Sequence, residues 1–219
     1  ATIYGAKRLI GRKVNADDVS WFARLAPFRI VAAPNGDAWV RVHGQPVSLA
    51  CDVGAIAVVG LQNIAERRIE QLVNPHLNSG LPAFLADNPG LQSGYMIAQV
   101  TAASLVSESK GLAHPASVDS IPSSANREDH VSMGTIAARR FRDVVEHAEW
   151  VLGIEALCAA RGLDLRLPLL AGEGARAAWS ALREAIPVEA GDHVMSGEIE
   201  AAAGLGRDGV LLRAAEGAI

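Results

Sequence analysis

A polar loop at residues 116–134 holds the side chains best suited to chemistry in this sequence. Pro115 and Pro122 exclude helix through most of it, and its Ser, Asn and Asp side chains compete for backbone hydrogen bonds. Polar groups packed this densely between two apolar helical patterns are costly unless each is hydrogen-bonded or used. The loop is therefore either a capping connection or part of a functional site, and the residues alone leave both alternatives open.

Titratable side chains lie near the end of this loop, among them Arg127, Glu128 and His130. Taken alone, Glu128 is typical of a capping carboxylate or of one that pairs with the neighbouring Arg127. A lone loop histidine such as His130 is more often a structural hydrogen-bonding group. Since no second His, Cys or acid stands at ligand spacing from it, we expect no metal site.

Helical patterns flank the loop on both sides and must position it. The sequence predicts helices at about 46–73, 94–113, from the loop to about 162, and 174–186, followed by a weakly amphipathic tail to 219. The first pattern is apolar nearly all round and then narrows to a stripe of Leu61, Ala65, Ile69 and Leu72, opposite Glu66, Arg67, Arg68 and Glu70. The helix after the loop shows a stripe of Phe141, Val145, Ala148 and Leu152. We therefore predict a mainly α fold, a bundle of long, roughly antiparallel helices.

The first 43 residues have a different pattern. An acidic helical turn at Asp17-Asp18 precedes two strand-like runs, 27–33 and 35–42, around Asn35-Gly36, which is a strong hairpin signal. We divide the chain into a small helix-plus-hairpin segment at 1–43 and a helical portion at 44–219. The short segment is expected to bury little apolar area.

Composition narrows the function classes. The chain has 219 residues, 50% of them hydrophobic, and a formal net charge of -4, which argues against a nucleic-acid surface. Its two cysteines, Cys51 and Cys158, lie in apolar helical patterns and are expected to be buried free thiols in a reducing, cytoplasmic compartment. We see no signal peptide and expect no membrane span. The sequence lacks an initiator Met, which is consistent with a start inside a longer reading frame.

The loop and its surroundings resemble the histidine ammonia-lyase family, part of the aromatic amino acid lyases. The matching runs are residues 113–122, 124–126 and 128–134 in the loop, with 63–70, 79–82, 90–99, 105–108 and 154–160 outside it. The resemblance extends from about His43 to the C-terminus and matches the C-terminal portion of that enzyme. It implies a helical bundle of the ammonia-lyase type that assembles into homo-oligomers, with sites built from several subunits.

The resemblance also implies a chemistry. The family removes ammonia from histidine to form urocanate, using an electrophilic methylidene-imidazolone ring made from an internal Ala-Ser-Gly triplet. This sequence contains no such triplet, and the family's catalytic tyrosine lies upstream of the matching region, so we expect that the ring is not formable from this chain. Glu128 matches a pocket glutamate that faces the substrate, where it accepts a hydrogen bond from an imidazole or takes part in proton transfer.

Three positions depart from the family pattern. Arg127 stands where these lyases usually carry a glutamine, which places a permanent charge beside Glu128. Val42 stands where a pocket phenylalanine is expected. Ser109 replaces the asparagine that usually follows Glu108. With Glu128, residues Arg127 and Val42 form the predicted substrate-binding set.

Residues 1–43 resemble another family, the early part of the heat-shock-seventy chaperone ATPase domain, through the runs 7–12 and 35–40. By that match, Lys7 stands where those ATPases place a lysine near the terminal phosphate. The phosphate-binding turns around it are absent, so Lys7 is expected to be a solvated charge without a nucleotide-binding role.

Two function classes follow from these resemblances. The first is a piece of a C–N lyase, active on a histidine-like substrate only if another chain supplies the ring and the tyrosine. The second is a non-catalytic helical protein, either a partner subunit of an intact lyase or a fusion relic. Because the first half of the 46–73 helix is apolar all round, both classes predict self-association or binding to a lyase subunit.

Overall fold

The computed structural model describes residues 12–25, 29–32, 34–41, 44–125 and 130–219. It divides into two compact units, one of residues 1–55 and 114–141 and the other of residues 56–113 and 142–219. Two long helices, α2 (Gly44–Val73) and α4 (Gly134–Asp164), contribute to both units. Each unit is described by itself below.

The N-terminal part of the first unit contains helix α1 (Asp17–Leu25) and the strands β1 (Arg29–Ala32) and β2 (Ala38–Arg41), which pair antiparallel. The predicted helix and hairpin are therefore confirmed. The hairpin connection is longer than a two-residue Asn-Gly turn, since Ala32 pairs with Ala38 and Gly36 takes a positive φ of 84°. Within this segment Val19, Phe22 and Ala38 form a small buried core.

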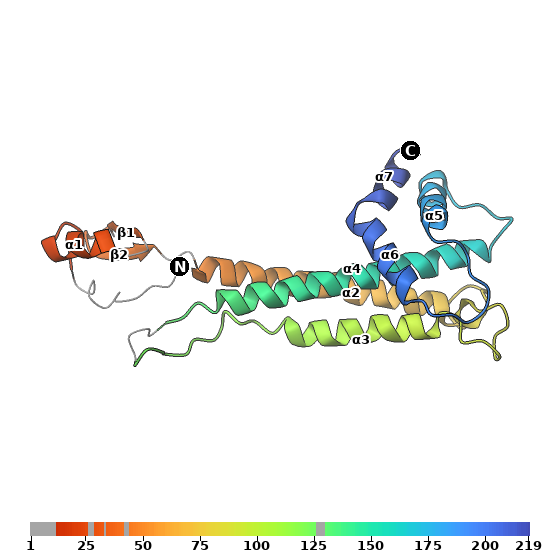
Figure 1. Cartoon of the computed structure of the whole chain (residues 1–219), viewed down its shortest axis with the longest axis horizontal. Coiled ribbons are helices and arrows are strands. Elements are labelled where there is room, and N and C mark those ends of the chain that lie inside the picture. Colours follow the sequence, from red (N-terminus) through yellow and green to blue (C-terminus); the bar gives the residue numbers. More distant parts are fainter. Residues whose placement is uncertain (1–11, 26–28, 33, 42–43, 126–129) are drawn as a thin grey trace. The chain divides into compact units, whose positions relative to one another are not determined.

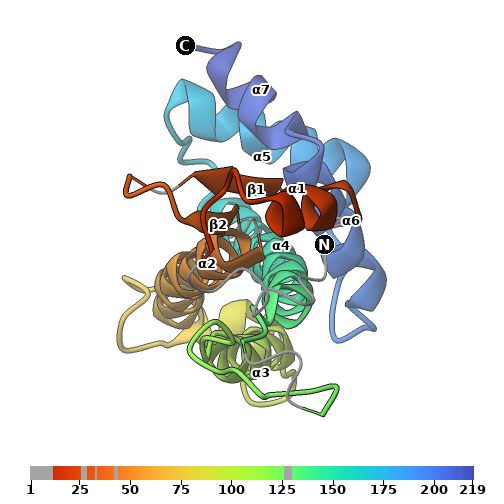
Figure 2. The same cartoon turned by 90° about the vertical axis from the view of Figure 1, so that its left-hand side faces the viewer.

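The second unit is a helical bundle, as predicted. Its parts of α2, α3 (Met96–Leu112) and α4 run side by side, and successive helices are antiparallel (Figure 1, Figure 2). Helix α2 ends at Val73, directly before Asn74-Pro75. This end is expected, because proline disfavours helical conformation in the residue before it. The short 3-10 turn η2 (Ala83–Leu85) lies in the connection to α3.

Three shorter helices complete this unit: α5 (Glu173–Ala185), α6 (Ser196–Arg207) and α7 (Val210–Glu216). Gly209 between the last two adopts a left-handed φ of 68°, which favours glycine. One apolar core joins the unit. Its fully buried members include Ala65 and Ile69 of α2, Ala102 of α3, and Val151, Ile154, Leu157 and Cys158 of α4.

The buried face of α2 differs from the predicted stripe. Ala65 and Ile69 are buried as expected, but Leu61 is 65% exposed and the polar Gln62 is buried instead. The Gln62 side chain donates a 2.7 Å hydrogen bond to the carbonyl of Val144. Glu66 is also buried, contrary to its assignment to the outer face, because it accepts hydrogen bonds from Arg67 and Gln99.

The stripe predicted for α4 is wrong as well. Leu152 is 51% exposed, while Val144 and Val151 are fully buried. Both faces of this helix carry apolar residues, and hydrophobic periodicity alone does not tell which face meets a neighbour.

The two cysteines are free, as predicted, but only Cys158 is buried, and Cys51 is half-buried. Burial raises the pKa of the Cys158 thiol far above its ordinary value, which makes it inert. Our expectation that no apolar run is long enough to span a bilayer needs correction. Within the described residues, the helix Pro46–Val73 passes that test by length and composition, a property that core helices of soluble proteins share.

Candidate functional site

The loop that carries the candidate catalytic residue is fixed at its start by a buried carboxylate. Asp52 of α2 is only 5% exposed and accepts a 2.7 Å hydrogen bond from the backbone N–H of Ser117. Ala116 and Ser117 are themselves buried. A charged hydrogen bond of this kind fixes the path of the chain where it leaves the preceding helix.

Two more contacts hold the loop and the residue His114 before it. Arg140 of α4 donates a 3.0 Å hydrogen bond to the carbonyl of His114. Across the loop, the Ser120 hydroxyl accepts a 2.9 Å hydrogen bond from the backbone N–H of Val131. This bond joins two described residues, one on each side of the stretch that contains Glu128.

The pKa of Asp52 follows from these contacts. Burial opposes the charge of its carboxylate and by itself would raise the pKa. The hydrogen bonds from Ser117 and Ala116, with the positive charge of Arg140, outweigh burial and hold the pKa below its usual value. Asp52 is therefore ionised at neutral pH and serves as an anionic anchor for the loop.

The predicted site residues Lys7, Val42, Arg127 and Glu128 all lie outside the described residues. The roles assigned to them remain predictions: Lys7 as a vestigial ATPase position, Val42 as a pocket residue, Arg127 as a substrate contact and Glu128 as the catalytic carboxylate. His130 is described and exposed. Ser109, the departure from the family asparagine, is fully buried in α3 with its hydroxyl 3.0 Å from Nδ1 of His147 in α4.

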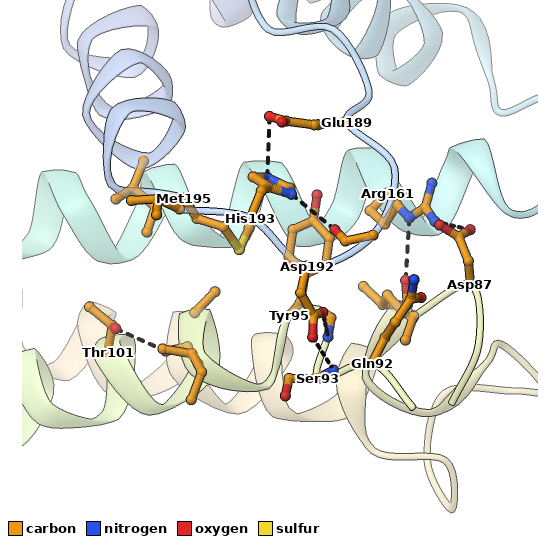
Figure 3. Close-up of a pocket in the computed structure, with 18 of the residues that line it drawn as sticks. Asp87, Gln92, Ser93, Tyr95, Thr101, Arg161, Glu189, Asp192, His193 and Met195 are labelled. Carbon is orange, nitrogen blue, oxygen red and sulfur yellow. Dashed lines mark hydrogen bonds and ion pairs between the residues drawn. The ribbon is translucent and has the colours of Figure 1, made fainter. Parts of the chain in front are cut away.

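A second feature, which the sequence did not predict, is a cavity of about 470 Å³ in the second unit (Figure 3). Its walls come from the connection before α3, the start of α3, α4, and the segment between α5 and α6. The residues labelled in the figure include Asp87, Gln92, Tyr95, Thr101, Arg161, Glu189, Asp192 and His193.

Two charged groups set the shape of this cavity. Arg161 is buried and donates hydrogen bonds to the carbonyl of Leu85 and to the carboxylate of Asp87. Asp192 accepts hydrogen bonds of 2.9 Å from the N–H groups of Ser93 and Gly94. These two bonds hold the pKa of Asp192 below its usual range and fasten the α5–α6 segment to the start of α3.

Beside Asp192, the imidazole of His193 lies among carboxylates (Figure 3). Its Nδ1 is 3.0 Å from the carbonyl of Gly191, and its Nε2 is 3.2 Å from a carboxylate oxygen of Glu198. Burial opposes the charged form, but the Gly191 carbonyl and the carboxylates of Glu198 and Glu189 raise the pKa of His193 overall. Residues 90–99 were part of the family resemblance. No local sequence signal predicted that they contact Asp192, about 100 positions later.

Comparison with known proteins places the chain in a family. The profile of the aromatic amino acid lyase family matches residues 41–184. The chain belongs to this family of lyases, as the loop and the helical bundle led us to expect.

The curated relatives that it matches are histidine ammonia-lyases. The enzyme from Natranaerobius thermophilus is 58% identical over 158 residues, which are 72% of this chain and 31% of that protein. The one from Symbiobacterium thermophilum is 52% identical over 98% of this chain and 42% of its own length, and that from Myxococcus xanthus is 57% identical over 97% and 41%. The chain thus spans about a third to two fifths of the length of these relatives.

Solved structures agree on the fold. The histidine ammonia-lyase from Trypanosoma cruzi superposes with a TM-score of 0.78 at 44% identity, covering 86% of this chain and 38% of the other. A tyrosine aminomutase from Streptomyces globisporus gives a TM-score of 0.77 at 36% identity, over 85% and 36%. The predicted ammonia-lyase type of bundle is confirmed.

Proposed function

We propose that this chain forms the C-terminal helical part of a histidine ammonia-lyase and that its loop presents Glu128 to a histidine-like substrate. The observation that carries the proposal is that two hydrogen bonds hold the loop. The Ser117–Asp52 hydrogen bond fixes its start, and the Ser120–Val131 hydrogen bond joins described residues that flank the stretch containing Glu128. A catalytic carboxylate needs such support, because small errors in its position lower the rate steeply.

The roles of the site residues follow from the chemistry of the family. Glu128 accepts a hydrogen bond from the substrate imidazole or takes part in proton transfer. Arg127 adds a permanent positive charge where the family usually has glutamine, and Val42 leaves more space than the expected phenylalanine. Both changes reshape the substrate pocket.

The electrophilic ring of the family activates the substrate's amino group as a leaving group. This sequence has no Ala-Ser-Gly triplet from which to form it, so the residues present do not fit that group. We propose that the ring and the catalytic tyrosine come from another segment or subunit in a cytoplasmic assembly. The ring's absorbance should be missing from the purified chain, which should release no ammonia from histidine.

Complementation tests this function. The chain is co-expressed with a fragment of a relative that contains Ala-Ser-Gly, and urocanate formation is followed by absorbance. Restored activity should fall by about 10²-fold or more with Glu128→Gln and stay unchanged with Glu184→Gln, an exposed glutamate on α5. Full activity with Glu128→Gln would remove this residue from the proposed site, and urocanate formation by the chain alone would refute the need for a second chain.

The alternative is a non-catalytic partner of an intact lyase. In that case the chain would co-purify with a full-length relative without adding active sites. Residues 1–43 bear on this alternative through their proposed chaperone-like origin. The alignments that cover 97–98% of this chain include most of these residues, so they indicate no separate origin for the segment.

A further inference from the structure

We propose that Glu189, His193 and Glu198 form a binding site for a divalent cation of the zinc type. The carboxylate and imidazole ligand atoms of these three residues lie within 4.8 Å of one another. The site lies in the second unit, in the segment between α5 and α6 and in the first turn of α6, whereas the loop of the proposed lyase function belongs to the first unit. It is independent of that function, and it departs from our expectation of no metal.

The tautomer of His193 is fixed by its neighbour. Because the carbonyl of Gly191 is only an acceptor, Nδ1 of His193 must carry the proton of their 3.0 Å hydrogen bond. Nε2 then faces the two carboxylates. A backbone carbonyl on the far nitrogen is the usual way in which proteins orient a metal-binding imidazole.

The facing nitrogen makes no hydrogen bond of its own. Nε2 of His193 is buried and makes no hydrogen bond within the described structure. It lies 3.2 Å from Oε1 of Glu198 and 4.0 Å from Oε2 of Glu189, and neither contact has hydrogen-bond geometry. An unprotonated Nε2 would direct its lone pair at two anions, which is unfavourable unless a proton on Nε2 or a cation between the ligands offsets their charge.

The distances suit a small cation. Ligand bonds of about 2.0–2.2 Å in a tetrahedral site place the ligand atoms about 3.3–3.6 Å apart. The His193–Glu198 pair is already close to this separation. The Glu189 side chain, 63% exposed, is free to move closer to the other two ligands. One imidazole and two carboxylates form a donor set that suits zinc, and a water molecule would complete the coordination.

Bound metal would act on the fold and not on the lyase chemistry. Glu189 and His193 belong to the segment that Asp192 fastens to the start of α3, whereas Glu198 belongs to α6. A cation that joins them would therefore stiffen the wall of the 470 Å³ cavity, to which Glu189 and His193 contribute (Figure 3). The expected signature is slower amide exchange at residues 187–200 when zinc is added.

Calorimetric titration of the metal-free full chain with zinc chloride tests the site. Wild type should bind one equivalent that His193→Gln and Glu198→Gln weaken by about tenfold or more. Glu189→Gln should also weaken it, and because this residue is exposed, its replacement leaves the packing intact. The matched control is His76→Gln, at an exposed histidine after α2, which should bind zinc like wild type.

Three outcomes would overturn the proposal. The first is the absence of zinc binding by wild type at micromolar protein concentration. The second is equal binding by wild type and all three site variants, which would indicate adventitious binding elsewhere. The third is zinc binding without any slowing of amide exchange at 187–200, since the cation would then lie at another site.

Discussion

The backbone N–H of Ser117 donates a 2.7 Å hydrogen bond to the carboxylate of Asp52, a residue 65 positions earlier in the chain. This bond joins the loop that carries Glu128 to helix α2. It explains why an acidic residue lies buried in the most apolar part of that helix. The same helix therefore supplies both an apolar surface and the support for the candidate site.

Removing this anchor should destabilise the loop. Asp52→Ala leaves the N–H groups of the loop without their acceptor, and we expect a loss of about 1–3 kcal/mol in the free energy of unfolding. Amide exchange should accelerate at residues 116–125. The control is Asp119→Ala in the same loop, where the side chain is exposed and the thermal midpoint should hardly change. Equal effects of the two substitutions would contradict the anchoring role.

The same carboxylate predicts a pH dependence. The folded-state pKa of Asp52 is lowered, so its stabilising contribution is present above the unfolded value of about 3.9 and is lost as the pH falls through the folded value. The stability difference between wild type and Asp52→Asn should therefore be constant above about pH 5 and shrink below about pH 4. Urea unfolding at several pH values measures it. A difference that grows on acidification would refute the assignment.

Two helical glycines differ in the space around them, so their substitutions by alanine form a matched pair. A Cβ added at Gly153 of α4 would lie 2.8 Å from the backbone nitrogen of Ala203 in α6, and backbone cannot move aside cheaply. Gly153→Ala should therefore cost about 1–3 kcal/mol. Gly60 of α2 has nothing within 4 Å of the same position, so Gly60→Ala should stabilise its helix by up to about 1 kcal/mol. Thermal unfolding of both variants compares them directly.

Self-association is expected from the exposed apolar residues of α2. Six large apolar residues of this helix are 49–65% exposed: Val47, Leu49, Val53, Ile56, Leu61 and Ile64. Exposed apolar surface on this scale is typical of an interface. The double substitution Leu61→Lys/Ile64→Lys should shift light scattering towards the monomer, whereas Leu91→Lys, at a residue 91% exposed outside the helices, should not. A monomeric wild type that binds no apolar dye would count against this interface.

A substitution at Arg127, which departs from the family pattern beside Glu128, tests substrate binding. In a complemented lyase, Arg127→Gln restores the residue that the family usually carries and removes a fixed positive charge. We expect the KM for histidine to fall and kcat to change less. Steady-state kinetics on urocanate formation measures both. A higher KM would show that the arginine itself binds the substrate.

Local physics was enough to predict the long helices and the loop. Proline after Asn74 ends α2, and Pro115 with Pro122 keeps the loop out of helical conformation. The resemblance carried by residues 113–134 was enough to indicate the family, because a long run of matched residue types is specific. These features depend on neighbours in the chain, which the sequence displays directly.

Tertiary structure decided which faces are buried and which distant groups meet. On α2, packing buried Gln62 and Glu66 and left Leu61 exposed; the Gln62 amide donates to the Val144 carbonyl on α4, and the Glu66 carboxylate accepts from Gln99 on α3. The same holds for Asp192, whose acceptor role depends on N–H groups 98 and 99 residues earlier. Hydrophobic periodicity records that a face is apolar but not which element covers it, so these contacts followed only from the folded chain.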